Sequence, residues 1–278
     1  TQRKIAHILS TADAVIEKTQ TAIAKYKAIK QGMLHDLFTR GIDTKTGKLR
    51  PKYEDAPEFY KESKIGIMPQ EWKELIFDEI IKSVDSGWSP NCLVEPASLG
   101  EWGSLKTTSV TWAGYNPNEN KKLPLNIIPR KETEVNYNDI LITRVGPRAR
   151  VGVVVHVNDR RKRLMVSDNM LRFKMNKNEK IFLPFLALFL GSQFVQSEWQ
   201  KRIAGLAEAQ VVINQQIIKK TIIVLPKEKE QKAIYEKLYS IMSKIQTEQN
   251  YLHKLQQIKA GLMADLLSGK KEVIVDEE

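Results

Sequence analysis

A segment of 38 residues that occurs twice constrains the fold of this chain more than any other feature. Gln2–Thr39 recurs without a gap as Gln231–Ser268, at a constant offset of 229 residues. The identical pairs under this offset include Gln2/Gln231, Ile5/Ile234, Leu9/Leu238, Ile16/Ile245, Gln20/Gln249, Lys25/Lys254, Ile29/Ile258, Gly32/Gly261, Asp36/Asp265 and Leu37/Leu266. Repetition across such a distance indicates that one structural element is used twice.

Both copies have the apolar periodicity of a long helix. Apolar positions alternate steps of four and three residues, which is the seam of a coiled coil. The seam is Ile5, Leu9, Ala12, Ile16, Thr19, Ile23 and Tyr26 in the first copy, and Ile234, Leu238, Ile241, Ile245, Glu248, Leu252 and Leu255 in the second. Thr19 and Glu248 place polar groups at matching positions, which can fix the register at some cost in stability.

Beyond Tyr26 the pattern permits two continuations. Because a straight helix has about 3.6 residues per turn, we expect the apolar stripe to leave the strict heptad there. The positions expected inside are then Ile29, Ile258, Met33 and Leu262, and those expected outside are Lys30 and Lys259.

The first copy leads into the intervening segment and the second leaves it, so the two helices should lie antiparallel. At about 1.5 Å per residue they predict a rod about 57 Å long. Ile8 and Val15 are apolar but lie beyond the seam of the first helix, and we expect them to bind a partner helix. The alternative is an ordinary helical hairpin with no partner.

The composition is that of a basic globular protein. The formal net charge of +11 favours a polyanionic partner, most often nucleic acid. No apolar run approaches the roughly 20 residues of a membrane span. The single cysteine, Cys92, excludes an internal disulfide framework and predicts a cytoplasmic location. Because Thr1 falls inside an expected helix, we expect the chain to be a fragment of a longer protein.

Five segments follow from these patterns. They are the first long helix (1–41), a connector (42–64), a head (65–226), the second long helix (227–269) and a charged tail (270–278). In the head we expect a short helical stretch ending at 82, strands at 139–145, 151–157, 164–175 and 221–225, a helix at 184–203, and a loop at 209–218 leading to a short helix. Asn214 is the expected N-cap of that helix, and Trp72 and Trp199 are expected in the core. The fold class is therefore α+β, with a mixed-sheet head and a long antiparallel helical hairpin.

Several ordered motifs carry a family resemblance. They are IGIMPQEW (65–72), NDILITRVGPRARVG (138–152), VSDNMLRF (166–173), INQQIIKKTIIVLPKEKEQKAI (213–234) and the helix endings QGMLHDLFT and AGLMADLLS. Together they make the chain resemble the specificity subunit of type I restriction–modification systems. Members of that family usually carry two target recognition domains separated by two such helices, whereas this chain has one domain flanked by both helices.

The resemblance implies a function and a set of partners. The head would be a target recognition domain that reads one half of a bipartite double-stranded DNA target. The helices would act as a spacer that docks methyltransferase subunits, and a restriction subunit would join the complex. S-adenosylmethionine, ATP and Mg²⁺ would then be bound only by the partners, with no cofactor in this chain. Head-to-tail pairing of two copies would supply the second head.

The residues themselves do not predict catalysis. The four histidines, His7, His35, His156 and His253, are scattered and lack metal-ligand spacing. Residues 115–118 read YNPN, which is not the Asn-Pro-Pro-aromatic motif of an amino-methyltransferase. We therefore expect no catalytic or metal-binding residues. Two alternatives remain: an autonomous sequence-specific DNA-binding regulator, and a non-catalytic fragment of a DNA methyltransferase or nuclease.

Arginines dominate the expected DNA-binding residues. Arg148 and Arg150 lie in a Gly-Pro turn between two expected strands, and Arg144 lies near the end of the first of these strands. Guanidinium groups there can reach guanine O6 and N7. The neighbouring basic run at 160–163 fits either phosphate contact or a solvated hairpin tip.

A second set of expected DNA contacts is polar rather than basic. Lys106, Thr107, Thr108 and Ser109 suit phosphates and thymine methyl groups, and the alternative is an ordinary strand. Asn169 and Gln210 carry amides that can pair with adenine, although either can instead bond local backbone.

Overall fold

The computed structural model describes residues 2–176, 180–207 and 210–271. The chain forms two compact units. The helical unit takes Thr1–Asp36 and Glu236–Glu278, and the head unit takes Leu37–Tyr235. The two long helices are α1 (Gln2–Thr39) and α6 (Glu228–Leu267), so one end of each belongs to the head unit.

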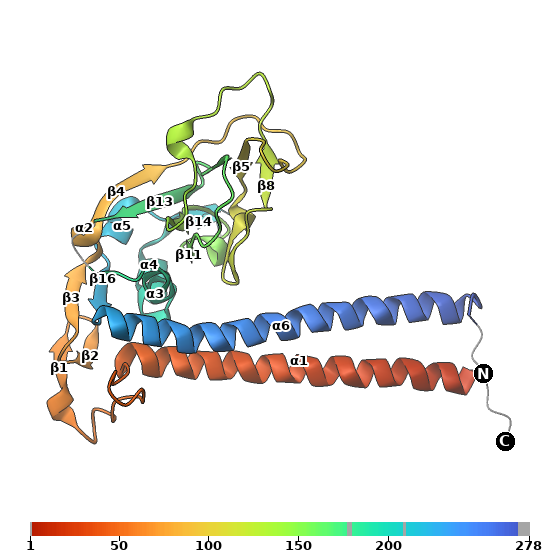
Figure 1. The fold of residues 1–278 in the computed structure, drawn as a ribbon, viewed down its shortest axis with the longest axis horizontal. Coiled ribbons are helices and arrows are strands. Elements are labelled where there is room, and N and C mark those ends of the chain that lie inside the picture. The colour runs from red at the N-terminus through yellow and green to blue at the C-terminus, as the bar shows by residue number, and fades with distance from the viewer. Residues whose placement is uncertain (1, 177–179, 208–209, 272–278) are drawn as a thin grey trace. The chain divides into compact units, whose positions relative to one another are not determined.

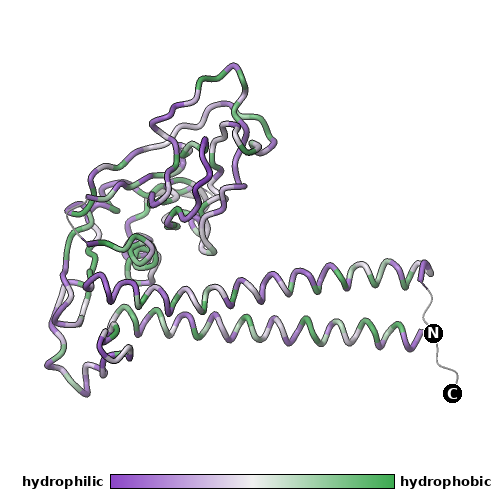
Figure 2. Tube along the Cα trace, in the orientation of Figure 1, coloured by the Kyte–Doolittle hydropathy of each residue, from purple (hydrophilic) through white to green (hydrophobic). Residues whose placement is uncertain are grey.

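The helical unit is a pair of antiparallel helices. Figure 1 shows α1 and α6 side by side, running in opposite directions. Asp13 of α1 forms an ion pair with Lys259, and the Tyr26 ring lies 4.8 Å from the ammonium of Lys244. As the residue number rises along α1, that of its partner falls along α6, which confirms the antiparallel prediction. Figure 2 shows the alternation of apolar and polar residues along both helices.

The expected drift of the seam is wrong at Ile29 and Ile258, although Met33 and Leu262 are half-buried as expected. Ile29 and Ile258 are 41% and 49% exposed, whereas Lys30 and Lys259 are half-buried. The strict heptad continues because each helix packs against a partner along its length, which keeps the same face inward. The aliphatic stems of the two lysines fill the seam, and Asp13 pairs with the ammonium of Lys259.

The head unit is built on three larger sheets. The four-stranded antiparallel sheet has the order β11 (Val154–His156), β9 (Ile140–Thr143), β13 (Met170–Met175) and β4 (Ile81–Ser86). A mixed sheet joins β12 (Leu164–Met165) in parallel to β5 (Gly103–Leu105), which pairs with β8 (Asn120–Lys122). The third sheet has the order β10 (Val145–Gly146), β15 (Gln210–Val212) and β14 (Ala204–Ala207). The α+β class with a mixed sheet is confirmed.

Short pairs and helices complete the head unit. The pairs are β1 (Tyr60–Ser63) with β2 (Gly66–Pro69), β3 (Lys73–Ile76) with β16 (Ile222–Leu225), and β6 (Val110–Thr111) with β7 (Gly114–Tyr115). The α-helices are α2 (Phe77–Ile80), α3 (Leu183–Leu190), α4 (Gln193–Arg202) and α5 (Gln215–Lys219). The 3-10 turns are η1 (Pro57–Phe59), η2 (Thr107–Ser109), η3 (Lys131–Thr133) and η4 (Arg148–Arg150).

The core and one helix cap agree with the sequence predictions. A cluster of buried aliphatic residues joins the sheets: Leu105, Val110, Val135, Leu141, Val153, Val155, Val157, Leu164, Val166 and Met170. Trp72 and Trp199 are each 1% exposed, and the indole N–H of Trp199 donates to the Thr221 hydroxyl at 2.7 Å. The Asn214 side chain accepts from the Gln216 N–H at 2.7 Å, which confirms the N-cap.

Several predicted elements differ from the structure. The strands expected at 139–145 and 164–175 are each divided between two sheets, as β9 and β10 and as β12 and β13. The helix expected at 184–203 is two helices, because Ser192 is extended at the junction and ends the first helical run. The stretch expected to be helical up to 82 keeps one turn, α2, since β3 and β4 around it pair with distant strands. Residues 210–212, expected in a loop, form β15.

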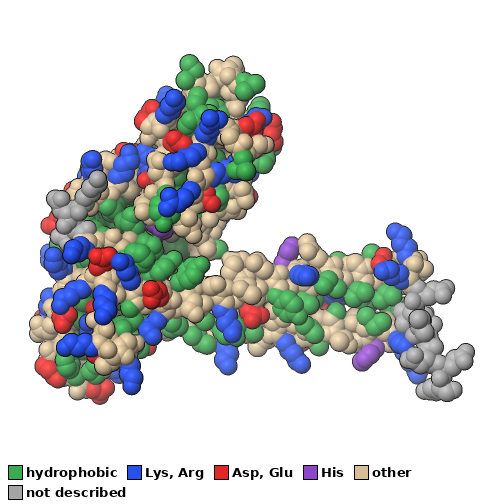
Figure 3. Space-filling model, viewed as in Figure 1, with side chains coloured by type: hydrophobic (Ala, Val, Ile, Leu, Met, Phe, Trp, Pro, Cys, Tyr) green, Lys and Arg blue, Asp and Glu red, His purple; other side chains and the backbone are tan. Residues whose placement is uncertain are grey.

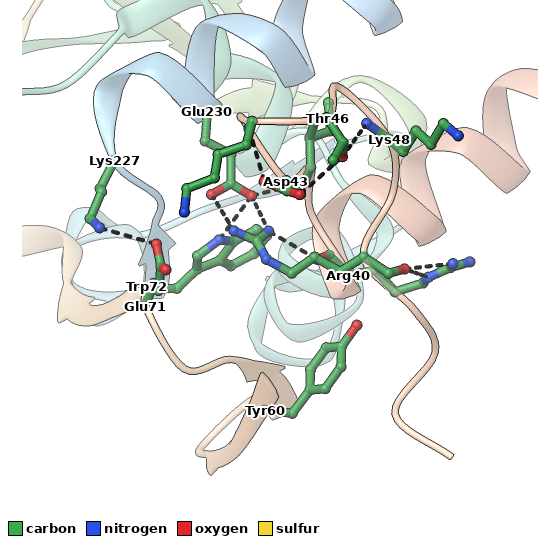
Figure 4. Close-up of polar contacts among 12 residues, drawn as sticks. Arg40, Asp43, Thr46, Lys48, Tyr60, Glu71, Trp72, Lys227 and Glu230 are labelled. Atoms are coloured by element: carbon green, nitrogen blue, oxygen red, sulfur yellow. Dashed lines mark hydrogen bonds and ion pairs between the residues drawn. The ribbon is translucent and has the colours of Figure 1, made fainter. Parts of the chain in front are cut away.

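A buried ion pair, the neck cluster, fastens the connector to the start of α6 (Figure 4). Glu230 is 1% exposed, and its carboxylate accepts from Arg50 at 2.5 and 3.0 Å, from the Trp72 indole at 3.2 Å and from the Ile42 N–H at 2.9 Å. Gly41 has a φ of 65°, and a Cβ there would lie 2.2 Å from the Glu230 carboxylate. This close approach requires glycine.

Candidate nucleic-acid interface

The loop that carries Arg144, Arg148 and Arg150 is fixed by backbone geometry. It leaves β9 at Thr143, whose hydroxyl donates to the Arg150 carbonyl and accepts from the Val153 N–H at 3.0 Å. The Gly152 N–H donates to the Thr143 carbonyl at 2.9 Å and closes the loop. The three arginines are therefore carried by a loop whose backbone is closed by hydrogen bonds at its base.

The backbone of Arg144 joins three segments that are distant in sequence. Its N–H donates to the Asn169 carbonyl at 2.7 Å, and its carbonyl accepts from the Ile213 N–H at 3.0 Å. Next to it, β10 pairs with β15, the strand on which Gln210 lies. The structure thus brings Arg144, Asn169 and the Gln210 strand to one edge of the head unit.

Solvent exposure divides the expected DNA-binding residues. Thr108, Asn169 and Gln210 are exposed, and the half-buried residues are Lys106, Thr107, Arg144, Arg148 and Arg150. Ser109 is fully buried, so its hydroxyl cannot contact DNA in this conformation, contrary to expectation. The η2 turn places Thr108 outside and the next side chain inside.

Arg150 holds two loops together. Its guanidinium donates to the carbonyls of Thr107 at 2.8 Å and Val110 at 3.2 Å. These bonds connect the 144–150 loop to the segment around η2. Because its Nη2 group is engaged with two backbone carbonyls and its Nε is buried, Arg150 positions the interface rather than reading a base.

A carboxylate moderates the charge near η2. Glu119 lies 3.6 Å from the Lys106 ammonium and accepts from the Thr108 hydroxyl at 2.6 Å. The Thr108 hydrogen bond, followed by the Lys106 charge, lowers the pKa of Glu119, so this carboxylate stays ionised at neutral pH. The positive charge of the candidate interface therefore comes mainly from Arg144 and Arg148.

The basic run at 160–163 has a third role, which the sequence interpretation did not include. Arg161 donates to the Ala97 carbonyl at 2.5 Å and to the Asn118 side chain at 3.2 Å. Arg163 donates to the Gly100 carbonyl, and Arg160 lies 4.2 Å over the Tyr137 ring. These arginines hold neighbouring loops in place.

Comparison with known proteins gives the family. The model of the type I restriction modification DNA specificity domain matches residues 106–259, which is more than half of the chain. The chain belongs to this family. Its match covers η2, the Arg144–Arg150 loop, Asn169 and Gln210, and therefore every expected DNA-binding residue.

The curated relatives that this chain matches are longer than the chain itself. It is 37% identical over 183 residues to the Type I restriction enzyme EcoEI specificity subunit of Escherichia coli, covering 66% of this chain and 30% of the relative. It is 26% identical over 278 residues to the Type I restriction enzyme MjaVIII specificity subunit of Methanocaldococcus jannaschii, covering 98% of this chain and 60% of the relative. The chain thus spans 30% and 60% of the length of these two proteins.

Solved structures show the same fold. The Type-I restriction-modification system S subunit from M. genitalium matches 94% of this chain and 59% of its own, with a TM-score of 0.58 and 15% identity. The HsdS subunit from Thermoanaerobacter tengcongensis matches 95% of this chain and 56% of its own, with a TM-score of 0.53 and 14% identity. Within the described ranges, no helix is long and apolar enough to cross a membrane.

A polar rim that the sequence did not predict lies beside Asn169. The Ser89 hydroxyl donates to the Asp168 carboxylate at 2.5 Å and accepts from the Asp168 N–H at 3.2 Å. Gly87 makes this approach close, because a Cβ there would lie 2.1 Å from the Val166 carbonyl. The Ser-Gly-Trp-Ser-Pro segment at 86–90 is typical of a turn, but only the fold shows that it meets Asp168.

The expected partner residues lie on the helical unit. Ile8 and Val15 of α1 are half-buried. Ile29, which the sequence analysis placed in the seam, falls 14 residues after Val15 and so at the same heptad position, and Ile258 is its equivalent in α6. The correct seam thus leaves a longer apolar stripe at the surface of α1 than Ile8 and Val15 alone indicated.

Proposed function

We propose that this chain is the DNA sequence-specificity part of a type I restriction–modification complex, and that its head reads one half of a bipartite target. The observation that carries the proposal is the gathering of Arg144, Asn169 and the Gln210 strand at one edge of the head unit, within the segment that matches the family. Each of these side chains has donor groups suited to a base edge.

The chemistry of this edge favours readout of the major groove. Arg144 and Arg148 can bond guanine O6 and N7, and the amides of Asn169 and Gln210 can bond adenine N6 and N7. The Asp168 carboxylate can accept from cytosine N4. Lys106 and Thr108 lie beside this set through Arg150 and suit phosphate contacts.

The test is selection of bound sequences from a library of random double-stranded DNA. The wild-type chain should enrich one short motif. Arg148→Ala and Asn169→Ala should each relax one position of that motif and weaken binding by roughly 1–3 kcal/mol. Lys201→Ala, on α4, is the control, because Lys201 is exposed and pairs with Glu198. Enrichment of an identical motif by all variants would contradict the assignment of these residues.

We also propose that α1 docks a methyltransferase subunit. Its apolar stripe of Ile8, Val15 and Ile29 lies outside the seam, where another helix can complete a bundle. S-adenosylmethionine, ATP and Mg²⁺ then belong to partner subunits, and the restriction subunit joins through the complex. Ile8→Glu with Val15→Glu should abolish co-purification with the methyltransferase subunit, whereas Ser10→Glu, an exposed position on the same helix, should not.

A second head is the remaining part of the proposal. Gln2 and Leu267, which are the repeat equivalents of Gln231 and Phe38, are exposed in the helical unit. A second copy of the chain, arranged head-to-tail, would cover them with its own head. Light scattering over a range of concentrations should show dimers, and Leu267→Glu should weaken them. A mass that stays monomeric at high concentration would contradict the homodimer but not DNA reading.

A further inference from the structure

The loop between β8 and η3 combines apolar and basic residues in an unusual way. The loop itself, residues 123–130, has one cation, Arg130, and no acidic residue, and it is flanked by Lys121 and Lys122 on β8 and by Lys131 and Glu132 on η3. At its tip Leu125 is 100% exposed, and Ile128 is 87% exposed. Figure 3 shows hydrophobic side chains together with Lys, Arg and some Asp or Glu side chains over the loops around β5 and β8.

The loop is anchored at both ends. Leu123 is buried, and its N–H donates to the Trp102 carbonyl at 2.8 Å. Thr133 is buried as well, and both its N–H (3.0 Å) and its hydroxyl (2.7 Å) donate to the Arg130 carbonyl. The Arg130 guanidinium lies 4.4 Å over the Trp88 ring, which orients its charge.

The tip itself is a tight turn. The Ile127 N–H donates to the Pro124 carbonyl at 3.0 Å, so Leu125 and Asn126 occupy the two central positions. Pro124 and Pro129 fix φ on either side of the exposed residues. The Leu125 side chain is therefore exposed to water on a turn whose backbone conformation is already restricted.

The tip around Leu125 differs from a neighbouring loop with exposed apolar residues in the charged residues beside it. Val94 and Leu99 are also more than four-fifths exposed, but their loop carries Glu95 and Glu101. Glu101 pairs with Lys122 at 2.7 Å. The tip around Leu125 has no acidic residue between Leu123 and Lys131, although Glu132 follows in η3. Arg130 and Lys131 lie beside the tip, and their charge is complementary to DNA rather than to another basic surface.

We propose that Leu125, supported by Ile128, is a wedge that enters the minor groove of the bound DNA and partly unstacks one base step. Apolar side chains used in this way kink the duplex, while nearby Arg and Lys contact the phosphates on either side. Here those cations are Arg130 and Lys131, and Asn126, next to Leu125 in the turn, is exposed as well. The inference rests on the proposed function, because it needs a head that binds double-stranded DNA.

The experiment uses the full chain and the motif obtained by library selection. Duplexes with 2-aminopurine at successive positions report unstacking through fluorescence, and energy transfer between dyes on the duplex ends reports bending. The wild-type chain should raise fluorescence at one step and shorten the end-to-end distance. Leu125→Ala should abolish both signals and weaken binding about tenfold. Leu99→Ala is the matched control and should leave both signals unchanged.

The outcomes separate the wedge from the proposed function. If the wild-type chain enriches no motif, the proposed function fails. If it binds its motif without unstacking any step, and Leu125→Ala binds equally well, the wedge is wrong and DNA reading stands. If Leu125→Ala leaves DNA binding intact but loses co-purification with the methyltransferase subunit, the tip is a protein contact, which also overturns the wedge.

Discussion

The two copies of the repeat have nearly the same pattern but different surroundings. In α6, Gln231 is fully buried and bonds the Phe182 N–H and the Lys180 and Pro226 carbonyls, whereas Gln2 of α1 is exposed. At the other end of the repeat, Phe38 is 4% exposed and its equivalent, Leu267, is 67% exposed. At each end of the repeat, the residue of one copy is therefore buried in the head unit, whereas the equivalent residue of the other copy is exposed to solvent. Similar sequence does not imply similar energetic contribution.

Phe38 should show the largest difference between equivalent positions. Its ring packs edge-on against Phe185 and Phe189, with centroids 5.8 and 5.4 Å away. Phe38→Ala should lower the free energy of unfolding by about 3–5 kcal/mol because it leaves a cavity. Leu267→Ala should change it by less than about 0.5 kcal/mol. Urea titration followed by tryptophan fluorescence measures both, and equal losses would remove the distinction between the copies.

The neck cluster should give the next largest effect. Glu230→Gln leaves the Arg50 guanidinium, 12% exposed, without its counter-ion and should cost about 3 kcal/mol. Replacing both residues, as Glu230→Met with Arg50→Met, should restore much of this loss, because the uncompensated charge is then gone. Thermal unfolding of the single and double variants checks the prediction. A double variant no more stable than Glu230→Gln would show that the cluster is needed for more than charge balance.

A smaller difference is expected between the two glutamines. Gln231→Ala leaves the Phe182 N–H and two carbonyls without their side-chain partner, so it should cost about 1–3 kcal/mol. Gln2→Ala removes an exposed side chain and should be close to neutral. Hydrogen exchange at the Phe182 amide gives a local measurement, since protection there should fall only in the Gln231 variant.

The smallest effect concerns the lysines of the seam. Burial lowers the pKa of Lys30 from its usual 10.5, so the folded state binds its proton more weakly than the unfolded state does. The free energy of unfolding should therefore rise as the pH increases through the folded pKa towards 10.5. Lys30→Met should remove that part of the pH dependence. Lys259→Met should retain it, because this variant keeps Lys30.

Local periodicity was sufficient to predict much of the helical unit but not its seam to the end. The steps of four and three gave the buried Thr19, Ile23 and Ile245 correctly. The drift to Ile29 was wrong because the period of a single straight helix does not include the partner that keeps the heptad face inward. A lysine is tolerated in that face because its aliphatic stem packs in the seam while its ammonium group reaches solvent or a carboxylate.

The structure of the head was harder to predict from the sequence, because contacts between residues distant in the chain determine it. The strands around 140–143 and 170–175 were found from their apolar runs, and the Asn214 cap from local chemistry. Nothing near Ser109 indicates that η2 turns its hydroxyl inward, and Arg150 reaches carbonyls about 40 residues away. The residue types therefore identified the candidate DNA-binding residues. Only the fold shows which of these side chains lie at the surface and which ones hold the interface in place.

The uninterrupted heptad has a consequence for how such a rod can change length. Only insertions of whole heptads in both helices preserve the seam, and each adds about 10 Å, or about three base pairs of DNA. Three base pairs also rotate the duplex by about 100°, since one turn takes about 10.5 base pairs. A longer rod would carry a head to the correct distance but to a different side of the double helix. A heptad that keeps the seam of the rod therefore does not keep the rotational position on the DNA. A change in spacer length must be accommodated by DNA twist or by the orientation of the head.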